Sequence, residues 1–334
     1  MKKPASEILL SAWYEGRTWF LPFLILLWPL SQCLQVVARI RRIVLQRRQP
    51  ILSLPVVVIG NIALGGTGKT PLICWLAVSL QARGIRVGII SRGYGGSHTG
   101  KPRLVQASDD AAVVGDEPLL LARRTGCPVI VAHDRLAAAR WFCAQASVDL
   151  ILSDDGLQHY RLPRTLEIAV LDGVRGIGNG FCLPAGPLRE APRRLQEVNC
   201  VVVNGDTGTV FRDDQYIMQL QPCNWRALHD GNVLPLDFLP GNQRVHAVAG
   251  IGNPSRFFAT LRRMGLDVIE HAFPDHHRFS AGDLQFGDDL PVVMTEKDEM
   301  KCKSIAPQQT YALIVDAVSD SRLPDRIASL VRDK

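Results

Sequence analysis

The sequence contains no CxxC pair, no repeat of fixed period and no low-complexity tract. These absences exclude a zinc or disulfide framework, a solenoid and a collagen-like chain, and the eight scattered cysteines fit small core residues in a reducing compartment. Aromatic residues make up only 7% of the 334 residues, but 47% are hydrophobic and 21% charged, which excludes a disordered chain. This length allows one large domain or two ordinary ones.

Acidic residues are scarce in the first 50 positions. This segment contains eight basic residues and two acidic ones, so it accounts for the whole formal net charge of +6. A protein that binds nucleic acid would be expected to carry basic stripes on its folded body. We therefore predict contact with an anionic lipid surface and no nucleic-acid partner.

Charged residues are absent from residues 18–38, which read TWFLPFLILLWPLSQCLQVVA. A helix of this length spans about 30 Å, the thickness of a bilayer core, and Trp19 and Trp28 suit its interfaces. The arginines that follow (Arg39, Arg41, Arg42, Arg47 and Arg48) predict that the rest of the chain lies in the cytoplasm. Pro22 and Pro29 leave full crossing and insertion into one leaflet both open. The alternative is a buried helix of a soluble protein.

Beyond Pro50 the pattern changes to short apolar runs separated by helical stretches. The runs predict buried strands over 54–60, 85–91, 127–132, 148–153, 167–171 and 200–204, and helices are expected over 71–83 and 134–146. This alternation predicts an α/β fold with a P-loop NTPase-like parallel sheet.

The composition also suggests domain boundaries. We expect an N-terminal membrane-anchoring helix with its basic flank over 1–50 and a P-loop kinase domain over 51–205. A linker rich in Gly, Asp, Asn and Pro is predicted over 206–243. A second, smaller α/β domain is expected over 244–334, ending in a helix near 322–333.

A glycine-rich loop follows the first strand and opens a helix. Its glycines let backbone amides converge on a phosphate, Lys69 can reach the β and γ phosphates, and the Thr70 hydroxyl can bind magnesium. The standard motif has glycine at the position of Ala63, so the match is shortened to GGTGKT. The predicted nucleotide-binding residues are Ala63, Leu64, Gly65, Gly66, Thr67, Gly68, Lys69 and Thr70.

Acidic residues at two further places are candidates for the chemistry. Asp154 and Asp155 follow an apolar strand in the manner of a Walker B element, which holds a metal ion. Asp116 and Glu117 stand in a GDEP turn. Capping of a turn or helix is the structural alternative for both pairs.

Two classes of function compete on these features. The chain has no NKxD guanine signature, which weakens a GTPase interpretation, and Leu64 stands where partitioning ATPases carry a signature lysine. A kinase is favoured, and the alternative is a membrane-associated P-loop ATPase that acts as a switch or partitioning factor. ATP turnover with and without a lipid acceptor separates the two.

The whole set of motifs resembles the tetraacyldisaccharide 4'-kinases, the lipid A 4'-kinases of Gram-negative bacteria. The matching segments, in order, are VVVIGNIALGGTGKTP, SRGYGG (91–96), GDEP, SDDGLQHY (153–160), LPAGPLRE (183–190), VAGIGNP (248–254), FPDHHRF (273–279) and MTEKDEMK (294–301). The absence of glycine at position 63 also resembles the P-loop of that family.

The resemblance implies a reaction and a place for it. ATP with Mg²⁺ would phosphorylate the 4'-hydroxyl of a tetraacyldisaccharide 1-phosphate at the cytoplasmic face of the inner membrane. The partners would be the lipid disaccharide and the anionic membrane surface. The sequence does not indicate the oligomeric state.

The resemblance also implies residue roles. Asp116 would be the catalytic base, with His276 as its partner, although position within the motif alone separates His276 from His277. Lys69 and Asp155 are the other expected catalytic residues. Thr70, Asp154 and Glu117 would serve the metal.

Arginine and tyrosine in loops at strand ends are candidates for the substrate or for ATP. Arg92, Tyr94 and Arg189 suit phosphate contacts, and pairing with surface acids is the alternative. Residues 295–298 (TEKD) begin a predicted helix, and capping accounts for them equally well.

Overall fold

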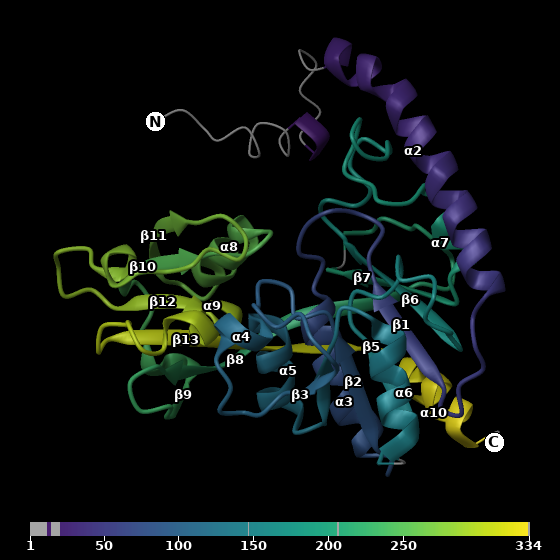
Figure 1. Cartoon of the computed structure of the whole chain (residues 1–334). Coiled ribbons are helices and arrows are strands. Elements are labelled where there is room, and N and C mark those ends of the chain that lie inside the picture. The colour runs from purple at the N-terminus through teal and green to yellow at the C-terminus, as the bar shows by residue number, and fades with distance from the viewer. Residues whose placement is uncertain (1–11, 15–20, 146, 206, 333–334) are drawn as a thin grey trace. The chain divides into compact units, whose positions relative to one another are not determined.

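The computed structural model describes residues 12–14, 21–145, 147–205 and 207–332 (Figure 1). The chain forms two compact units, each assembled from separate stretches. The first unit comprises Met1–Ile90, Arg135–Gln219 and Ser319–Lys334. The second unit comprises Ser91–Asp134 and Leu220–Val318.

A parallel sheet forms the centre of the first unit. Its order is β8-β7-β6-β1-β5-β2, and every adjacent pair in this order is parallel. The inner strands are mostly apolar and are buried along their whole length, as expected for a sheet covered on both faces. The strands are β1 (Val56–Gly60), β2 (Val87–Ser91), β5 (Leu150–Ser153), β6 (Leu166–Asp172), β7 (Cys200–Asn204) and the beginning of β8 (Tyr216–Ala227).

Helices pack against this sheet and against one another. The P-loop leads from β1 into α3 (Lys69–Gln81), which contacts both β1 and the C-terminal helix α10 (Arg322–Arg332). Two further helices, α6 (Arg135–Gln145) and α7 (Arg194–Glu197), belong to the same unit. Because the loop lies between a buried strand and a buried helix, its backbone is held at both ends.

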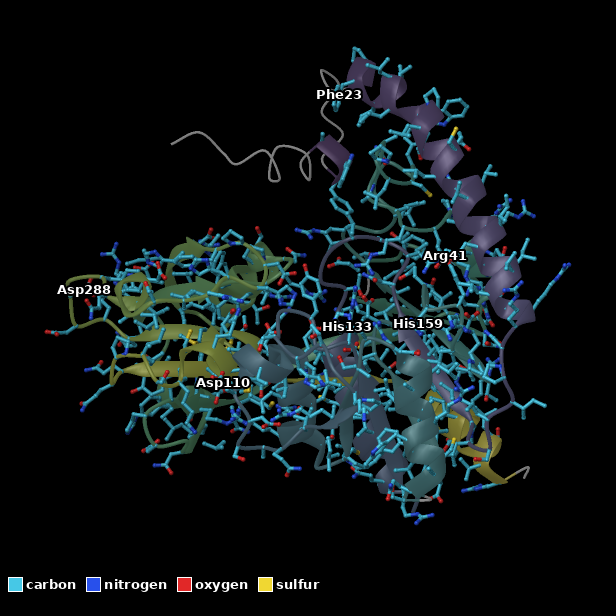
Figure 2. All side chains as sticks on the ribbon, in the orientation of Figure 1. Phe23, Arg41, Asp110, His133, His159 and Asp288 are labelled. Atoms are coloured by element: carbon cyan, nitrogen blue, oxygen red, sulfur yellow. The ribbon has the colours of Figure 1, made fainter. Side chains whose placement is uncertain are left out.

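A long apolar helix, α2 (Leu21–Arg47), precedes the sheet and runs beside α7 (Figure 1). The most apolar 18-residue window of this helix has a mean hydropathy of 1.6, and only 11% of that window is buried. Leu26 is 74% exposed. A few polar contacts tie the helix to the unit, including Ser31 Oγ donating to the Cys182 carbonyl at 2.8 Å. Figure 2 shows Phe23 and Arg41 on this helix.

The membrane segment predicted over 18–38 overlaps α2. Residues 18–20, and with them Trp19, lie outside the described residues. The helix is long and apolar enough to cross a bilayer. It continues without interruption through Pro29 and ends within the arginine-rich flank.

A run of paired strands also forms the core of the second unit. Its order is β11-β10-β12-β13-β8, with parallel pairing between the first four. Its strands are β9 (Val233–Pro235), β10 (Arg244–Ala249), β11 (Asp267–Ala272), β12 (Val292–Thr295), β13 (Thr310–Ser319) and the rest of β8. Its helices are α8 (Pro254–Arg263), α9 (Glu296–Cys302) and the short turns η2 (Leu236–Phe238) and η3 (Ala281–Leu284).

The remaining part of the second unit comes from far earlier in the chain. This stretch contains β3 (Arg103–Leu104), α4 (Ala111–Val114), α5 (Asp116–Thr125) and β4 (Val129–Val131). Helix α5 packs against α9, about 180 residues later in the sequence. The packing therefore brings the GDEP turn and the TEKD turn into one unit.

The predicted strands and helices agree with the observed ones to within a few residues, whereas the domain boundaries differ. Residues 91–134, which were expected within the 51–205 domain, belong to the second unit. The predicted linker over 206–243 contains β8, the longest strand, along with β9 and η2. The Gly, Asp, Asn and Pro residues of this segment favoured a linker in the sequence, but the segment contains β8, whose side chains are mostly half-buried. Residue 206 lies outside the described part.

Trp225 should be a major contributor to the stability of the second unit. Its side chain is fully buried among residues such as Leu239, Phe257 and Phe258, and its indole donates to the Leu236 carbonyl at 3.1 Å. We expect Trp225→Ala to lower the free energy of unfolding by about 3–5 kcal/mol in urea titrations, because it leaves a large cavity. Val233→Ala, at a residue that is 57% exposed, is the control. Equal small losses would contradict this assignment of the core.

Candidate active site

The P-loop curls because two of its glycines adopt positive φ angles. Gly65 has φ +103° and Gly68 has φ +92°, a region that side chains with a Cβ rarely occupy. A Cβ added to Gly68 would also lie 2.3 Å from Nδ2 of Asn204. That amide, at the end of β7, donates to the Thr67 carbonyl at 3.0 Å. A buried asparagine of β7, two strands from β1 in the sheet, thus braces the loop.

The LPAGPLRE segment braces the other side of the loop. Leu64 N donates to the Pro187 carbonyl at 2.8 Å, and Arg189 N donates to the Ile62 carbonyl at 2.6 Å. Ala63 and Leu188 form an isolated antiparallel bridge between these two bonds. Ala63 is only 2% exposed, so its methyl group packs inside the protein where the standard motif has glycine. The two motifs therefore form one structural unit.

A carboxylate with two cations lies beside the loop. Asp155 Oδ1 is 3.4 Å from Nζ of Lys69, and its Oδ2 is 3.1 Å from Nη1 of Arg189. Burial raises the pKa of this carboxyl group, but Lys69 and Arg189 more than offset that effect and lower it to about 2. Asp155 also has a positive φ of 45°. The carboxylate is ionised at all ordinary pH values.

The two other metal candidates of the first unit are both oxygen donors. Thr70 stands in the first turn of α3. Asp154 follows β5, is 1% exposed and donates its backbone N–H to the Ile90 carbonyl at 2.8 Å. A hydroxyl and a buried carboxylate are hard ligands of the kind that Mg²⁺ prefers.

A second cluster surrounds Asp116, the first residue of α5. Its carboxylate is 4% exposed, and Oδ1 accepts from the backbone N–H of Glu117 at 3.0 Å. Oδ2 lies 3.3 Å from Nδ1 of His276, 4.0 Å from Nζ of Lys297 and 3.9 Å from Nζ of Lys301. Burial raises the pKa of Asp116, but His276 and the two lysines outweigh it, so the net shift is downward.

The lysines project from one face of α9, four residues apart. Lys297 Nζ contacts Glu117 Oε1 at 2.9 Å and Asp275 Oδ1 at 3.3 Å. Burial lowers the pKa of Lys297, yet these carboxylates raise it well above its ordinary value. Lys301 pairs with Asp298 at 2.9 Å. Lys297 is therefore charged.

Of the two adjacent histidines, His276 faces Asp116. His277 instead pairs with Asp283 at 3.3 Å and packs against phenylalanine rings. Tyr94 is 58% exposed, and its ring lies 4.6 Å from that of His276. Arg92 is exposed in the same loop. The substrate candidates are thus divided, with Arg92 and Tyr94 in the second unit and Arg189 in the first.

Comparisons with known proteins agree on one family. A family model described as LpxK, tetraacyldisaccharide-1-P 4'-kinase, matches residues 23–332. The tetraacyldisaccharide 4'-kinase of Alkalilimnicola ehrlichii is 52% identical, with 91% of this chain and 92% of the relative covered. That of Pseudomonas aeruginosa is 48% identical, with 94% and 93% covered. The chain belongs to the tetraacyldisaccharide-1-P 4'-kinase family.

The fold of this family member also has a counterpart among solved structures. The crystal structure of LpxK from Aquifex aeolicus, in complex with ATP, has a TM-score of 0.76 at 24% identity. The match covers 93% of this chain and 99% of that one. The predicted fold class, an α/β P-loop architecture with an N-terminal apolar helix, is confirmed.

The described structure of this 4'-kinase family member contains participants that the sequence did not reveal. Lys297 was part of a motif explained equally well by capping, and Thr295 does cap α9 by accepting from Asp298 N. Lys301 and Asn204 were not singled out at all. The only signal in the sequence was the spacing of the two lysines, which places both on one helical face.

Glu117 was expected to serve the metal together with Thr70 and Asp154, and that role stays a prediction. Within the second unit its carboxylate pairs with Nζ of Lys297 at 2.9 Å.

The low pKa of Asp155 should depend on its cations. Lys69→Met and Arg189→Met should each raise it from about 2 toward the model-peptide value of about 3.9, because both cations lower it. In the wild type, the stability due to this ionised pair is present above about pH 4 and is lost as the pH falls through about 2. Carboxyl ¹³C NMR titration measures the pKa of Asp155 in the wild type and in the variants. An unchanged titration in Lys69→Met, as in the exposed control Lys101→Met, would contradict the pairing.

Proposed function

We propose that this chain transfers the γ-phosphoryl group of ATP to the 4'-hydroxyl of a tetraacyldisaccharide 1-phosphate in lipid A biosynthesis. The predicted family and kinase class are confirmed by relatives that bear this enzyme name and are about half identical over most of the chain. The alternative of a partitioning or switch ATPase has no support from these relatives. The Aquifex aeolicus LpxK structure is a complex with ATP, and the P-loop of this chain is a matching phosphate cradle.

The observation that carries the chemistry is the ionised, buried carboxylate of Asp116. A general base must be deprotonated and oriented before the substrate arrives. The lowered pKa of Asp116 meets the first need, and its contacts with Glu117 N and His276 meet the second. In this proposal Asp116 accepts the proton of the 4'-hydroxyl.

The proposed step is an in-line displacement. The 4'-oxygen forms a bond to the γ phosphorus while the bond from that phosphorus to the bridging oxygen of ADP breaks. The hydroxyl proton goes to Asp116, and ADP leaves with the bridging electrons. Lys69 and the amides of the loop around Gly65 and Gly68 stabilise the charge on the phosphoryl oxygens, and Asp155 orients Lys69.

Magnesium fits the oxygen donors of the first unit. Thr70 and Asp154 would hold it. When bound, it neutralises charge on the β and γ phosphates. Among the described residues, no group of three or more His, Cys, Asp or Glu side chains gathers to form a protein-only metal site. This suits an ion that keeps several waters and takes few protein ligands besides phosphate.

Three predicted substrate contacts retain a place in the proposal. Arg92 and Tyr94 are exposed in the loop that reaches His276, where they are available to the sugar or its 1-phosphate. Arg189 also lies beside the P-loop, where a guanidinium group suits phosphate. Its pairing with Asp155 makes an ATP phosphate the more direct partner.

Association with the membrane is expected of a lipid A enzyme, and α2 supplies the means. A lipid with four acyl chains leaves the bilayer at a cost of about 0.8 kcal/mol per CH₂, so the enzyme must act at the membrane. We propose that α2 inserts there and that Arg39, Arg41, Arg47 and Arg48 contact anionic headgroups on the cytoplasmic face.

Asp116→Asn should decrease phosphoryl transfer steeply. Loss of a positioned base costs about 10²- to 10⁴-fold in kcat, whereas ATP binding should remain near normal because Asp116 is not part of the P-loop. The assay follows ³²P from γ-labelled ATP to the lipid disaccharide. Asp289→Asn, an exposed residue of the same unit, is the control. Near-normal transfer by Asp116→Asn would show that another group is the base. ATP hydrolysis without labelled lipid would refute the proposed function.

Replacing exposed apolar residues of α2 should release the protein from membranes. We expect Leu26→Asp with Leu30→Asp to prevent flotation with anionic vesicles, since Asp costs about 2.5–3.5 kcal/mol at the centre of a membrane helix. Activity should fall more on bilayer lipid than on detergent-dispersed lipid. Val174→Asp with Val210→Asp, also exposed, is the matched control. Equal losses on both forms of substrate would assign α2 to the fold instead.

A further inference from the structure

We infer that Lys297 is a positioning residue that sets the tautomer of His276, so that the ring proton resides on Nδ1 and is directed at Asp116. The inference deepens the proposed function, on which it rests for the role of Asp116. It depends on contacts within the second unit only. It assigns a role to Lys297, which belongs to neither the P-loop nor the GDEP motif.

The donors of Lys297 and their acceptors match in number. An ammonium group has three N–H donors and no acceptor. Three acceptors surround Nζ within 3.3 Å: Glu117 Oε1 at 2.9 Å, Asp275 Oδ1 at 3.3 Å and His276 Nε2 at 3.3 Å. The more distant Asp116 Oδ2, at 4.0 Å, is left to other donors.

The contact with His276 decides which ring nitrogen carries the proton. Because Lys297 can only donate, Nε2 of His276 must accept, and in a neutral imidazole the proton then lies on Nδ1. Asp275 Oδ1 is 3.7 Å from Nε2, beyond hydrogen-bond distance, and is already engaged by Lys297. A protonated Nε2 would face the ammonium group, which is unfavourable.

The second ring nitrogen favours the same tautomer. Nδ1 lies 3.3 Å from Asp116 Oδ2, both atoms are buried and neither makes a hydrogen bond in this structure, and an ionised carboxylate can only accept. With the proton on Nδ1, both nitrogens make favourable contacts. With the opposite tautomer, both contacts become repulsive, since a lone pair faces the carboxylate and an N–H faces the ammonium group.

The surroundings hold this arrangement in place. Lys297 lies in the first turn of α9, whose start is capped by Thr295, and α9 packs against α5, which carries Asp116. The ring of Tyr94 covers His276 at 4.6 Å. With its proton on Nδ1, His276 orients Asp116, and the proton from the substrate hydroxyl ends on Asp116.

The tautomer can be measured directly on the full-length protein in detergent. Two-dimensional ¹H–¹⁵N spectra of ¹⁵N-histidine-labelled protein distinguish the two neutral tautomers, and the His276→Gln variant assigns the ring. We expect the wild type to show Nδ1 protonated and Nε2 unprotonated. A wild-type ring with the proton on Nε2, or a doubly protonated ring at pH 7.5, would overturn the inference.

Variants of Lys297 test the cause. Lys297→Met retains most of the stem but removes the donor, so the His276 signal should shift to a mixture of tautomers. The kcat for phosphoryl transfer should fall by about 10- to 100-fold, less than for loss of the base, with little change in KM for ATP. Lys297→Arg should restore the Nδ1–H tautomer and much of kcat, because a guanidinium group is also donor-only. Lys303→Met, at an exposed lysine just after α9, should change neither.

The two levels of the hypothesis fail in different ways. Absence of lipid phosphorylation by the wild type would refute the proposed function, whereas the tautomer would still be read from the spectrum. Normal phosphorylation with an unchanged tautomer in Lys297→Met would refute the inference alone. If Lys297→Met unfolds, the wild-type spectrum and Lys297→Arg still decide the question.

Discussion

Burying the carboxylate of Asp116 requires compensating charge, and much of the second unit is arranged to supply it. An isolated buried carboxylate would be protonated, because desolvation disfavours the charged form. The compensating charge comes from Lys297 and Lys301, and His276 lies 3.3 Å from the same carboxylate oxygen; these residues are on two segments that lie far along the chain from α5. The packing of α5 on α9 is therefore a requirement of the chemistry as well as of stability.

The first unit meets the same requirement at Asp155. There too a carboxylate is placed between two cations, Lys69 and Arg189, which come from different motifs. In both units the cations keep the carboxylate ionised, and the carboxylate in turn fixes the position of the cations. The ion pair at Asp155 positions Lys69 to bind phosphate, whereas the cations around Asp116 keep its carboxylate ready to accept a proton.

Bracing by neighbouring backbone accounts for the rest of the P-loop geometry. Positive φ angles at Gly65 and Gly68 carry a conformational cost that the surrounding structure must offset. Asn204 and the segment around Leu188 both do so. The bridge between Ala63 and Leu188 also explains why a buried methyl group is accommodated where the standard motif has glycine.

The linear sequence was sufficient for the strands, the helices around them, the P-loop and the apolar helix. Each of these depends on local periodicity or on a short motif, such as the glycines before Lys69. The family could also be inferred, because its motifs occur in order along the chain. Partnership between residues far apart, however, is not a local property. Tertiary packing decided that residues 91–134 join the second unit. It also decided that His276, and not His277, faces Asp116, and that Lys297 and Lys301 lie beside the same carboxylate. The physical reason is that a buried charge interacts with the groups that lie close to it in space, and the spacing of residues along the sequence does not give that distance.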